Sequence, residues 1–310
     1  MDQLVTIFWS AAFLGAAIRL SIPIMLAGIG EAISERGGVI NIGLEGMMLA
    51  GAFGAVVGAH VSGNPWIGLA CGMAAGVLIS LPHGVISINL GGDQIVSGVS
   101  LNLVALGLTT FLFRQLFGIT DQPQVPGFEP LDIPVLSQIP VLGPSVFSQS
   151  VLAYVAVAIG LVLWFLLFRS RWGLRWRAAG DDPAALDSVG VSVDRTRWGA
   201  LLVCAALAGM AGAAISLGQL FTFIENMTGG AGYVALALVI VARWNPLWAV
   251  VVAVAFGAAE AIALRVQAVG VTLIPYQLSL MLPYVLTLVV YGLAARSGRA
   301  PRALGKPFVK

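Results

Sequence analysis

Apolar runs of roughly 20 residues recur along the whole chain, and they restrict its fold more than any other feature. A helix of about 20 apolar residues is what crosses a hydrocarbon core of ~30 Å. Only 10% of the 310 residues are charged, whereas a soluble domain usually carries about 25%. Because so few charges cannot cover the surface of a soluble fold, the chain is predicted to be an all-α, polytopic membrane helix bundle.

The apolar segments predict one transmembrane domain over residues 1–310. The predicted spans are 4–28, 39–59, 66–87, 95–117, 150–168, 198–219, 230–242, 246–264 and 275–295. Their number is eight to ten, with nine the best count, because 230–242 is short and lies between a glycine cluster and the sequence "RWNP". Such a segment is typical of a re-entrant or broken helix. The first residues, "MDQLVTIFWS", lack the features of a removable signal peptide and are predicted to begin the first span.

Lys and Arg gather in two places, which predicts the orientation of the chain. The loop 169–197 contains six arginines, and the tail after Tyr291 contains five basic residues. Both are predicted to be cytoplasmic, the C-terminus included, which needs an even number of crossings between them. The proline-rich loop 118–149 has three acidic and no basic residues, so it is predicted to be extracytoplasmic. Arg114 and Arg265 then fall on the outer side, where the sequence offers no reason for them.

The loop 169–197 contains the start and stop signals of a short helix. Asp182 suits the N-cap, Pro183 the first helical position, and Gly190 the position just past the end. These residues predict a cytoplasmic helix of about two turns at 183–189. It is either a plain connection between two spans or a docking helix for a soluble partner.

Several stretches resemble the ABC transporter permeases of the branched-chain amino acid/simple sugar class. The sequence "AAGDDPAALDSVGVSV" (178–193) is similar to their cytoplasmic coupling-helix segment. Other stretches are similar to the nucleoside-type permeases of that class, and especially to the shorter of the two permeases that such systems encode. They are "GEAISERGGVINIGLEGMMLAGAF" (30–53), "DQIVSGVSLNLVALGLTTFL" (93–112), "YVALALVIVARWNPLWAV" (233–250) and "IPYQLSLMLPYVLTL" (274–288).

This resemblance implies a permease subunit of an ATP-driven importer in the bacterial plasma (inner) membrane. The implied partners, besides membrane lipid, are a second permease that forms a heterodimer with this chain, ABC ATPase subunits, and an extracytoplasmic substrate-binding protein. The implied substrates are nucleosides, above all purine nucleosides, with a simple sugar or riboflavin as the alternative. The implied ATPase-coupling residues are Asp181, Asp182, Pro183, Ala184, Ala185, Asp187 and Gly190.

The sequence has no ATP-binding motif, so ATP is expected to be hydrolysed by a separate subunit. A phosphate-binding loop needs a Gly-rich stretch followed by Lys and then Ser or Thr, whereas Gly305 and Lys306 are followed by Pro307. No cofactor or metal is expected on this chain, and no nucleophile–base pair points to an enzyme. The net charge of +2 gives no sign of nucleic-acid binding. The alternative of a different class is an ATPase-independent secondary transporter or channel, with coupling-ion carboxylates deep in several helices.

Charged residues near the second span raise a separate question. Glu31, Glu35 and Arg36 lie between the first two predicted spans and are expected to be interfacial. They are either solvated or mutually paired loop charges, or they brace the coupling loop or an ATPase contact.

Glu45 is the only charge between residues 39 and 59, and it follows Asn41 by four, so the two are expected to share one helix face. A carboxylate in mid-bilayer costs on the order of 2.5–3.5 kcal/mol or more. Glu45 is therefore expected either to line or brace the pathway or to be a structural hydrogen-bond hub.

Polar and aromatic side chains in other spans complete the predicted pathway for a polar substrate. The candidates are Asn41, Glu45, Asn102, Phe221, Gln277 and Tyr284. For any of them the alternative is a hydrogen bond between helices. Cys71 and Cys204 lie in apolar stretches and are predicted to be small buried residues, not a disulfide pair.

Overall fold

The computed structural model describes residues 11–118, 122–134, 136–268 and 300–308, with the isolated positions 281, 285 and 292. The start of the first predicted span and most of the last, with the pathway candidates Gln277 and Tyr284, lie outside the described residues.

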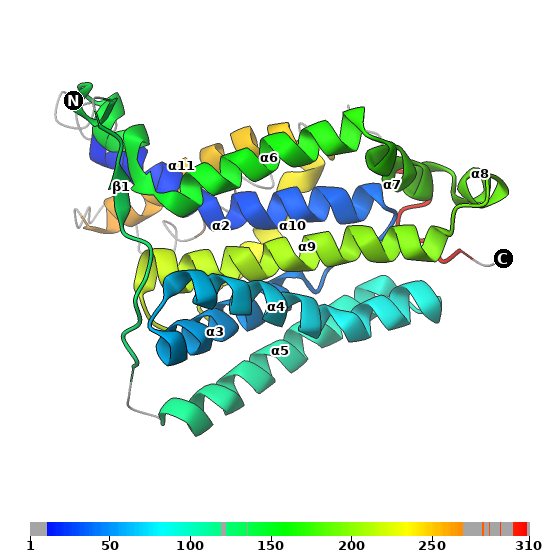
Figure 1. Ribbon diagram of the computed structural model, residues 1–310, viewed down its shortest axis with the longest axis horizontal. Helices are drawn as coiled ribbons and strands as arrows, with labels where there is room; N and C mark the ends of the chain where they lie inside the picture. Colours follow the sequence, from blue (N-terminus) through cyan, green and yellow to red (C-terminus); the bar gives the residue numbers. More distant parts are fainter. Residues whose placement is uncertain are drawn as a thin grey trace.

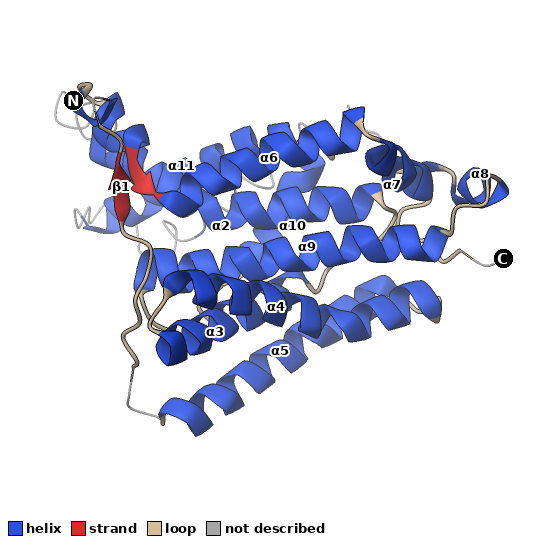
Figure 2. Cartoon of the chain, in the orientation of Figure 1, coloured by secondary structure: helices blue, strands red, loops and turns tan. Residues whose placement is uncertain are grey.

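The described chain is a helix bundle with one small sheet (Figures 1 and 2). The long helices are α2 (Ala11–Arg36), α3 (Leu44–Ser62), α4 (Pro65–Gly84), α5 (Gln94–Phe117), α6 (Val151–Arg169), α9 (Val193–Ile215) and α11 (Pro246–Ala268). The shorter ones are α7 (Arg171–Asp181), α8 (Pro183–Ser188) and α10 (Ala231–Val241). Wider π-helical turns at Val85–Asn89 and Ser216–Leu220 prolong α4 and α9, and short turns occur at Leu136–Gln138 and Gly143–Phe147.

Seven helices of the described residues are long and apolar enough to cross a membrane, which fits the predicted membrane bundle. The total of nine stays a prediction. Helix α10 has only 11 residues, so it rises about 16 Å, roughly half of the ~30 Å core. The short segment predicted at 230–242 is therefore a half-length helix.

Local signals explain where several helices begin. Asn64 accepts a hydrogen bond from the Trp66 amide before Pro65 opens α4, and Asp93 accepts two from the first turn of α5. Such caps replace partners that the first amides of a helix lack. Between the caps, long apolar runs form helices whose backbone N–H and C=O groups are hydrogen-bonded within the helix, as a lipid environment requires.

The core is formed where α2 and α9 meet their neighbours. Helix α2 packs against α9 and α11, and α3 packs against α4 and α9, whereas α5 lies along the edge of the bundle (Figure 1). In the most apolar stretch of α9, 83% of the residues are buried, and the corresponding shares are 78% in α3, 67% in α2 and 33% in α5. The interior is thus α9, α3 and α2, and α4, α5 and α6 present apolar faces outward.

Helices α3, α4 and α9 approach each other through glycines. A Cβ added at Gly72 would lie 2.8 Å from the carbonyl oxygen of Gly51, and one added at Gly51 would collide with the backbone of Gly209. Small residues at such crossings let backbones come into contact, which is how helices associate without a hydrophobic driving force between them.

The two ends of the bundle differ. At one end β1 (Pro130–Asp132) pairs antiparallel with β2 (Ser148–Ser150); except for Ser150, both strands lie in the segment 118–149 that was predicted as loop only. At the other end lie α7, α8 and residues 300–308 (Figure 1). The arginine-rich loop and residues 300–308 thus lie at the same end of the bundle, which agrees with the predicted even number of crossings between them. The loop also contains α7, a helix that the sequence did not predict. Which end is cytoplasmic stays a prediction.

Candidate functional site

The turn between α2 and α3 runs through the interior of the bundle instead of along its surface. This buried turn, residues 37–43, was predicted in part as helix, but α3 begins only at Leu44. Non-helical backbone inside a membrane bundle needs partners from elsewhere. The Ile40 amide donates to Gln94 Oε1 at 2.8 Å, and the Asn41 amide donates to Glu31 Oε1 at 2.9 Å. Side chains of α2 and α5 therefore supply the acceptors that a helix would have supplied.

Asn41 is fully buried in this turn, so it does not share a helix face with Glu45, contrary to the prediction. Its Nδ2 donates to Met47 Sδ at 3.2 Å and to Cys204 Sγ at 3.3 Å. The Cys204 thiol in turn donates to Glu31 Oε2 at 3.2 Å. Cys71 and Cys204 are free, as predicted, but Cys71 is only half-buried, and Cys204 is hydrogen-bonded to Asn41 and Glu31 and not only a small apolar residue.

Glu31, Glu35 and Arg36 are not solvated loop charges, which corrects that part of the first interpretation. All three belong to α2, and Glu31 and Glu35 are 0% and 5% exposed. Glu35 accepts a hydrogen bond from the indole of Trp244. Arg36 donates to the carbonyl oxygens of Arg243 and Trp244 at 3.3 and 3.2 Å. The end of α2 is thereby fixed to the connection between α10 and α11.

Glu45 binds the start of the half-length helix α10. Its Oε1 accepts hydrogen bonds from Thr228 Oγ1 at 2.6 Å and from the Gly230 amide at 2.8 Å, and its Oε2 accepts one from the Gly232 amide at 2.7 Å. The first amides of a helix have no partner within the helix, and its N-terminus attracts negative charge. The first turn of α3 thus caps α10 inside the bundle, and the role of Glu45 in lining or bracing the pathway stays a prediction.

Asn102 joins the same junction from α5. Its Oδ1 accepts a hydrogen bond from the Gly46 amide at 2.8 Å, and its Nδ2 donates to Ile42 O and to Tyr233 Oη, both at 2.9 Å. It therefore ties α5 to the buried turn and to α10. For Asn102, the predicted alternative of a hydrogen bond between helices is the arrangement found.

Phe221 lies away from this junction, at the end of the turn that prolongs α9. It has a positive φ of 56°, and its carbonyl oxygen accepts a hydrogen bond from the Val125 amide at 3.0 Å. Its ring lies against Gly127. These contacts hold the proline-rich segment to the end of α9, so the structure does not bring Phe221 together with Asn41, Glu45 and Asn102.

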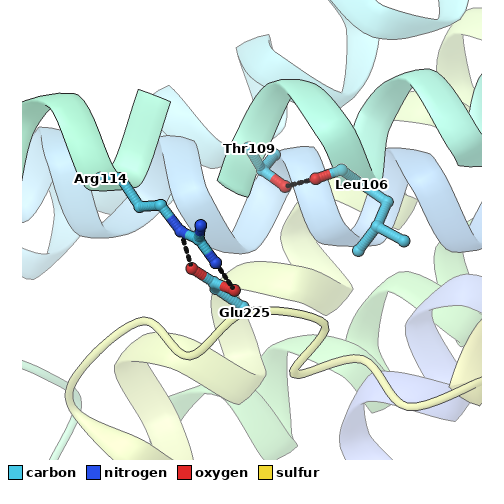
Figure 3. Close-up of polar contacts among 4 residues, drawn as sticks. All are labelled: Leu106, Thr109, Arg114 and Glu225. Carbon is cyan, nitrogen blue, oxygen red and sulfur yellow. Dashed lines mark hydrogen bonds and ion pairs between the residues drawn. The ribbon is translucent and has the colours of Figure 1, made fainter. Parts of the chain in front are cut away.

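Arg114, which the sequence left unexplained, forms an ion pair with Glu225. Its Nε donates to Oε1 at 2.7 Å and its Nη2 donates to Oε2 at 3.0 Å, from the last turn of α5 to the loop after α9 (Figure 3). The two side chains are 52% and 38% exposed. The Arg114 guanidinium lowers the pKa of Glu225 through these hydrogen bonds and its charge. Nothing in the sequence pattern signals a pair separated by so much chain.

Helix α8 is exposed and anchored at one point. Asp182 Oδ1 accepts a hydrogen bond from the Ala185 amide at 3.0 Å, and Gly190 has a φ of +78°, so the cap and the stop lie where the sequence places them. Leu186 is buried, at 5% exposure, whereas Val189 is 72% exposed. Of the remaining coupling candidates, Asp181 ends α7, and Pro183, Ala184, Ala185 and Asp187 belong to α8.

Polar pockets of about 430 and 740 Å³ lie at the end of the bundle, one beside Arg175 and Arg195 and the other beside Asp181 and Arg302, whereas the cavities between the spanning helices are apolar or small. A cavity of about 740 Å³ between α3, α4 and α5 is lined almost entirely by apolar side chains. A cavity of about 90 Å³ beside Thr228 and Glu260 is polar but smaller than the roughly 300–1,000 Å³ of typical ligand pockets. In the described part of the chain, no three His, Cys, Asp or Glu side chains gather to hold a metal ion.

Comparison with known proteins gives matches over most of the chain. Residues 13–291 match the model of a family described as the permease component of branched-chain amino acid transport systems. The nucleoside ABC transporter permease NupC of Lactococcus lactis is 36% identical, over 94% of both chains. The guanosine ABC transporter permease NupQ of Bacillus subtilis is 35% identical, over 95% of both chains. A putative glucose ABC transporter permease of Haloferax volcanii, TsgC13, is 38% identical, over 86% of this chain and 81% of its own.

Among solved structures, PsaBC from Streptococcus pneumoniae in complex with Fab superposes with a TM-score of 0.50. The superposition covers 93% of this chain and 92% of that one, at 14% sequence identity. At this identity the likeness concerns the fold alone.

Proposed function

Because the chain belongs to the permease family of branched-chain amino acid transport systems, we propose that it is one permease subunit of an ATP-driven importer in a bacterial plasma membrane. ATP is hydrolysed by separate ABC subunits, and a second permease completes the pathway. The cavity of about 740 Å³ between α3, α4 and α5 is apolar, which supports a polar pathway shared with another chain. An extracytoplasmic binding protein delivers the substrate.

The proposed substrates are nucleosides, purine nucleosides in particular. Two relatives that align over 94% and 95% of both chains carry nucleoside or guanosine in their names. The relative named for glucose makes a sugar the second candidate, although it aligns over a smaller part of the chain, 86%. A sugar and a nucleoside share hydroxyl groups, so the two candidates differ mainly in the base.

Helix α8 is the single observation that carries the proposed mechanism. It is a capped helix that stands out from the end of the bundle, with Ala184, Ala185 and Val189 exposed and only Leu186 buried. Such a helix fits a groove of an ATPase subunit. Closure of the ATPase dimer would displace α8 and move the two permeases against each other, which opens the pathway to alternate sides.

The proposal is tested by uptake of radiolabelled guanosine and adenosine in cells with and without the gene. Excess unlabelled inosine, D-glucose, ribose and riboflavin serve as competitors. Gene-dependent uptake that inosine blocks and the other compounds do not block is the expected result. If glucose blocks the uptake and inosine does not, the proposed substrate is a sugar and not a nucleoside. Uptake that persists when the partner ATPase gene is deleted would refute ATP-driven import and favour an independent transporter.

A further inference from the structure

The tail of the chain, residues 300–308, is threaded between helices at the end of the bundle where α7 and α8 lie (Figure 1). We call this segment the C-terminal strap. It has no regular secondary structure, and its path is fixed by bonds to parts of the chain far away in the sequence. The proposed function assigns it no role.

The backbone of the strap is hydrogen-bonded to three other elements. The Ala303 amide donates to Gly180 O at 2.8 Å, at the end of α7. The Gly305 amide donates to Gly38 O at 3.1 Å, in the buried turn. Arg197 Nη1, in α9, donates to the carbonyl oxygen of Lys306 at 2.9 Å. These three bonds, at Ala303, Gly305 and Lys306, link the position of the strap to that of α7, α9 and the buried turn.

The side chain of Phe308 joins the strap to α8. It packs against the small cluster of Ala179, Leu186 and Val193, and Leu186 is the buried anchor of α8. Towards the interior, Gly305 has a φ of +72° and lies so close to Ile40 that a Cβ added there would be 2.9 Å from its Cδ1. The strap thus packs at Phe308 against the cluster that contains the anchor of α8, and it touches the buried turn at Gly305.

We infer that the C-terminal strap transmits displacement of α8 to the buried turn between α2 and α3. From Phe308 back to Gly305 the extended chain spans at most about 10 Å, so a shift of Leu186 reaches Gly38 and Ile40 over a short connection. The buried turn in turn contacts Glu31, Gln94 and Asn102, and hence α5 and α10. The inference rests on the proposed docking of an ATPase at α8, and Phe308 is a positioning residue that does not contact the substrate.

The test uses the complete transporter, with its partner permease and ATPase subunits, reconstituted in lipid. Hydrogen–deuterium exchange is measured in the turn 37–43 and in α8, with and without ATP and vanadate. In the wild type both segments are expected to change exchange rate when nucleotide is trapped. In Phe308→Ala, α8 is expected to respond as before while the response of the turn is lost. Phe308→Leu keeps an apolar side chain at this position and should retain the response of the turn to trapped nucleotide.

Transport coupling provides the second readout. Guanosine molecules moved per ATP hydrolysed are expected to fall at least about fivefold in Phe308→Ala, the lower end of typical coupling between sites. Lys306→Ala, which removes an exposed side chain from the same segment, is the matched control and should transport like the wild type. If Phe308→Ala does not assemble, Gly305→Ala strains the strap at its φ of +72° and is expected to give the same loss.

The outcomes separate the inference from its premise. A turn that still responds to nucleotide in Phe308→Ala, with unchanged guanosine transport per ATP, would overturn the role of the strap. A wild-type complex in which α8 itself does not respond to trapped nucleotide would overturn the docking proposal, and with it the inference. A response of both segments without guanosine transport would overturn only the substrate assignment, because the exchange experiment needs no substrate.

Discussion

Replacing Glu45 should destabilise the bundle in steps that follow its hydrogen bonds. Glu45→Ala removes the acceptor of Thr228, Gly230 and Gly232 at once. An unsatisfied buried donor costs about 1–3 kcal/mol, so the three together amount to roughly 3–9 kcal/mol. That is comparable with the ~5–15 kcal/mol by which whole proteins are stable. Glu45→Ala is therefore expected to lose most folded protein.

The stability of Glu45→Gln should lie between that of the wild type and that of Glu45→Ala. Both Thr228 and Gly230 bond to Oε1, so an amide oxygen placed there keeps those two bonds. The amide nitrogen would then face the Gly232 amide, donor against donor, where Oε2 accepted before. One lost bond of about 1–3 kcal/mol is the expected effect.

The assay is the thermal stability of the detergent-solubilised protein, followed by fluorescence-detected size-exclusion chromatography, together with the KM and maximal rate of guanosine uptake. The expected order of stability is wild type, then Gln, then Ala, with a KM in Glu45→Gln close to that of the wild type. Equal stability of all three proteins combined with a raised KM would refute the reasoning. Glu45 would then contact the substrate instead of holding α10.

Three further outcomes are expected at other positions. Gly232→Ala should lower stability by more than about 1 kcal/mol, because its Cβ would lie 2.6 Å from the backbone of α3, whereas Gly107→Ala meets open space and should be neutral or stabilising. A double-mutant cycle on Arg114 and Glu225 should give a coupling at pH 7 that is lost as the pH falls below the ordinary glutamate value of 4.5, since the folded pKa of Glu225 lies lower still; a coupling unchanged at pH 3 would contradict this. Asp182→Ala should weaken α8 by about 1 kcal/mol and lower guanosine transport per ATP, while Asp182→Ser keeps a capping oxygen and should retain transport. Equal transport per ATP by these two variants would show that the Asp182 cap is not needed for coupling.

The sequence predicted the long helices well because each needs only local information. Apolar run length and caps such as Asp93 and Asp182 mark where most helices lie, and the scarcity of charge excludes a soluble fold. The short helix α10 was recognised from its length and from the glycines before it. These features depend on residues that are neighbours in the chain.

The polar junction could not be predicted because it depends on residues that meet only after folding. Helical spacing predicted that Asn41 and Glu45 share one face. In the structure, Glu31 and Gln94 accept hydrogen bonds from the turn 37–43 and so stabilise its non-helical backbone. With those acceptors the backbone no longer needs helix geometry to satisfy its amides. The path of the tail across Gly38 is hidden for the same reason.

The close glycine contacts of α3, α4 and α9 also bear on how the chain is made. Gly51 and Gly72 reach the membrane long before Gly209, on which both pack. At ~5–20 residues per second, the roughly 140 residues from Gly72 to Gly209 take on the order of ten seconds to synthesise. Throughout that interval the α3–α4 hairpin sits in the bilayer with its small-residue surface open to lipid tails or to other nascent helices. The packing of α3 and α4 against Gly209 can therefore be completed only after α9 has left the ribosome.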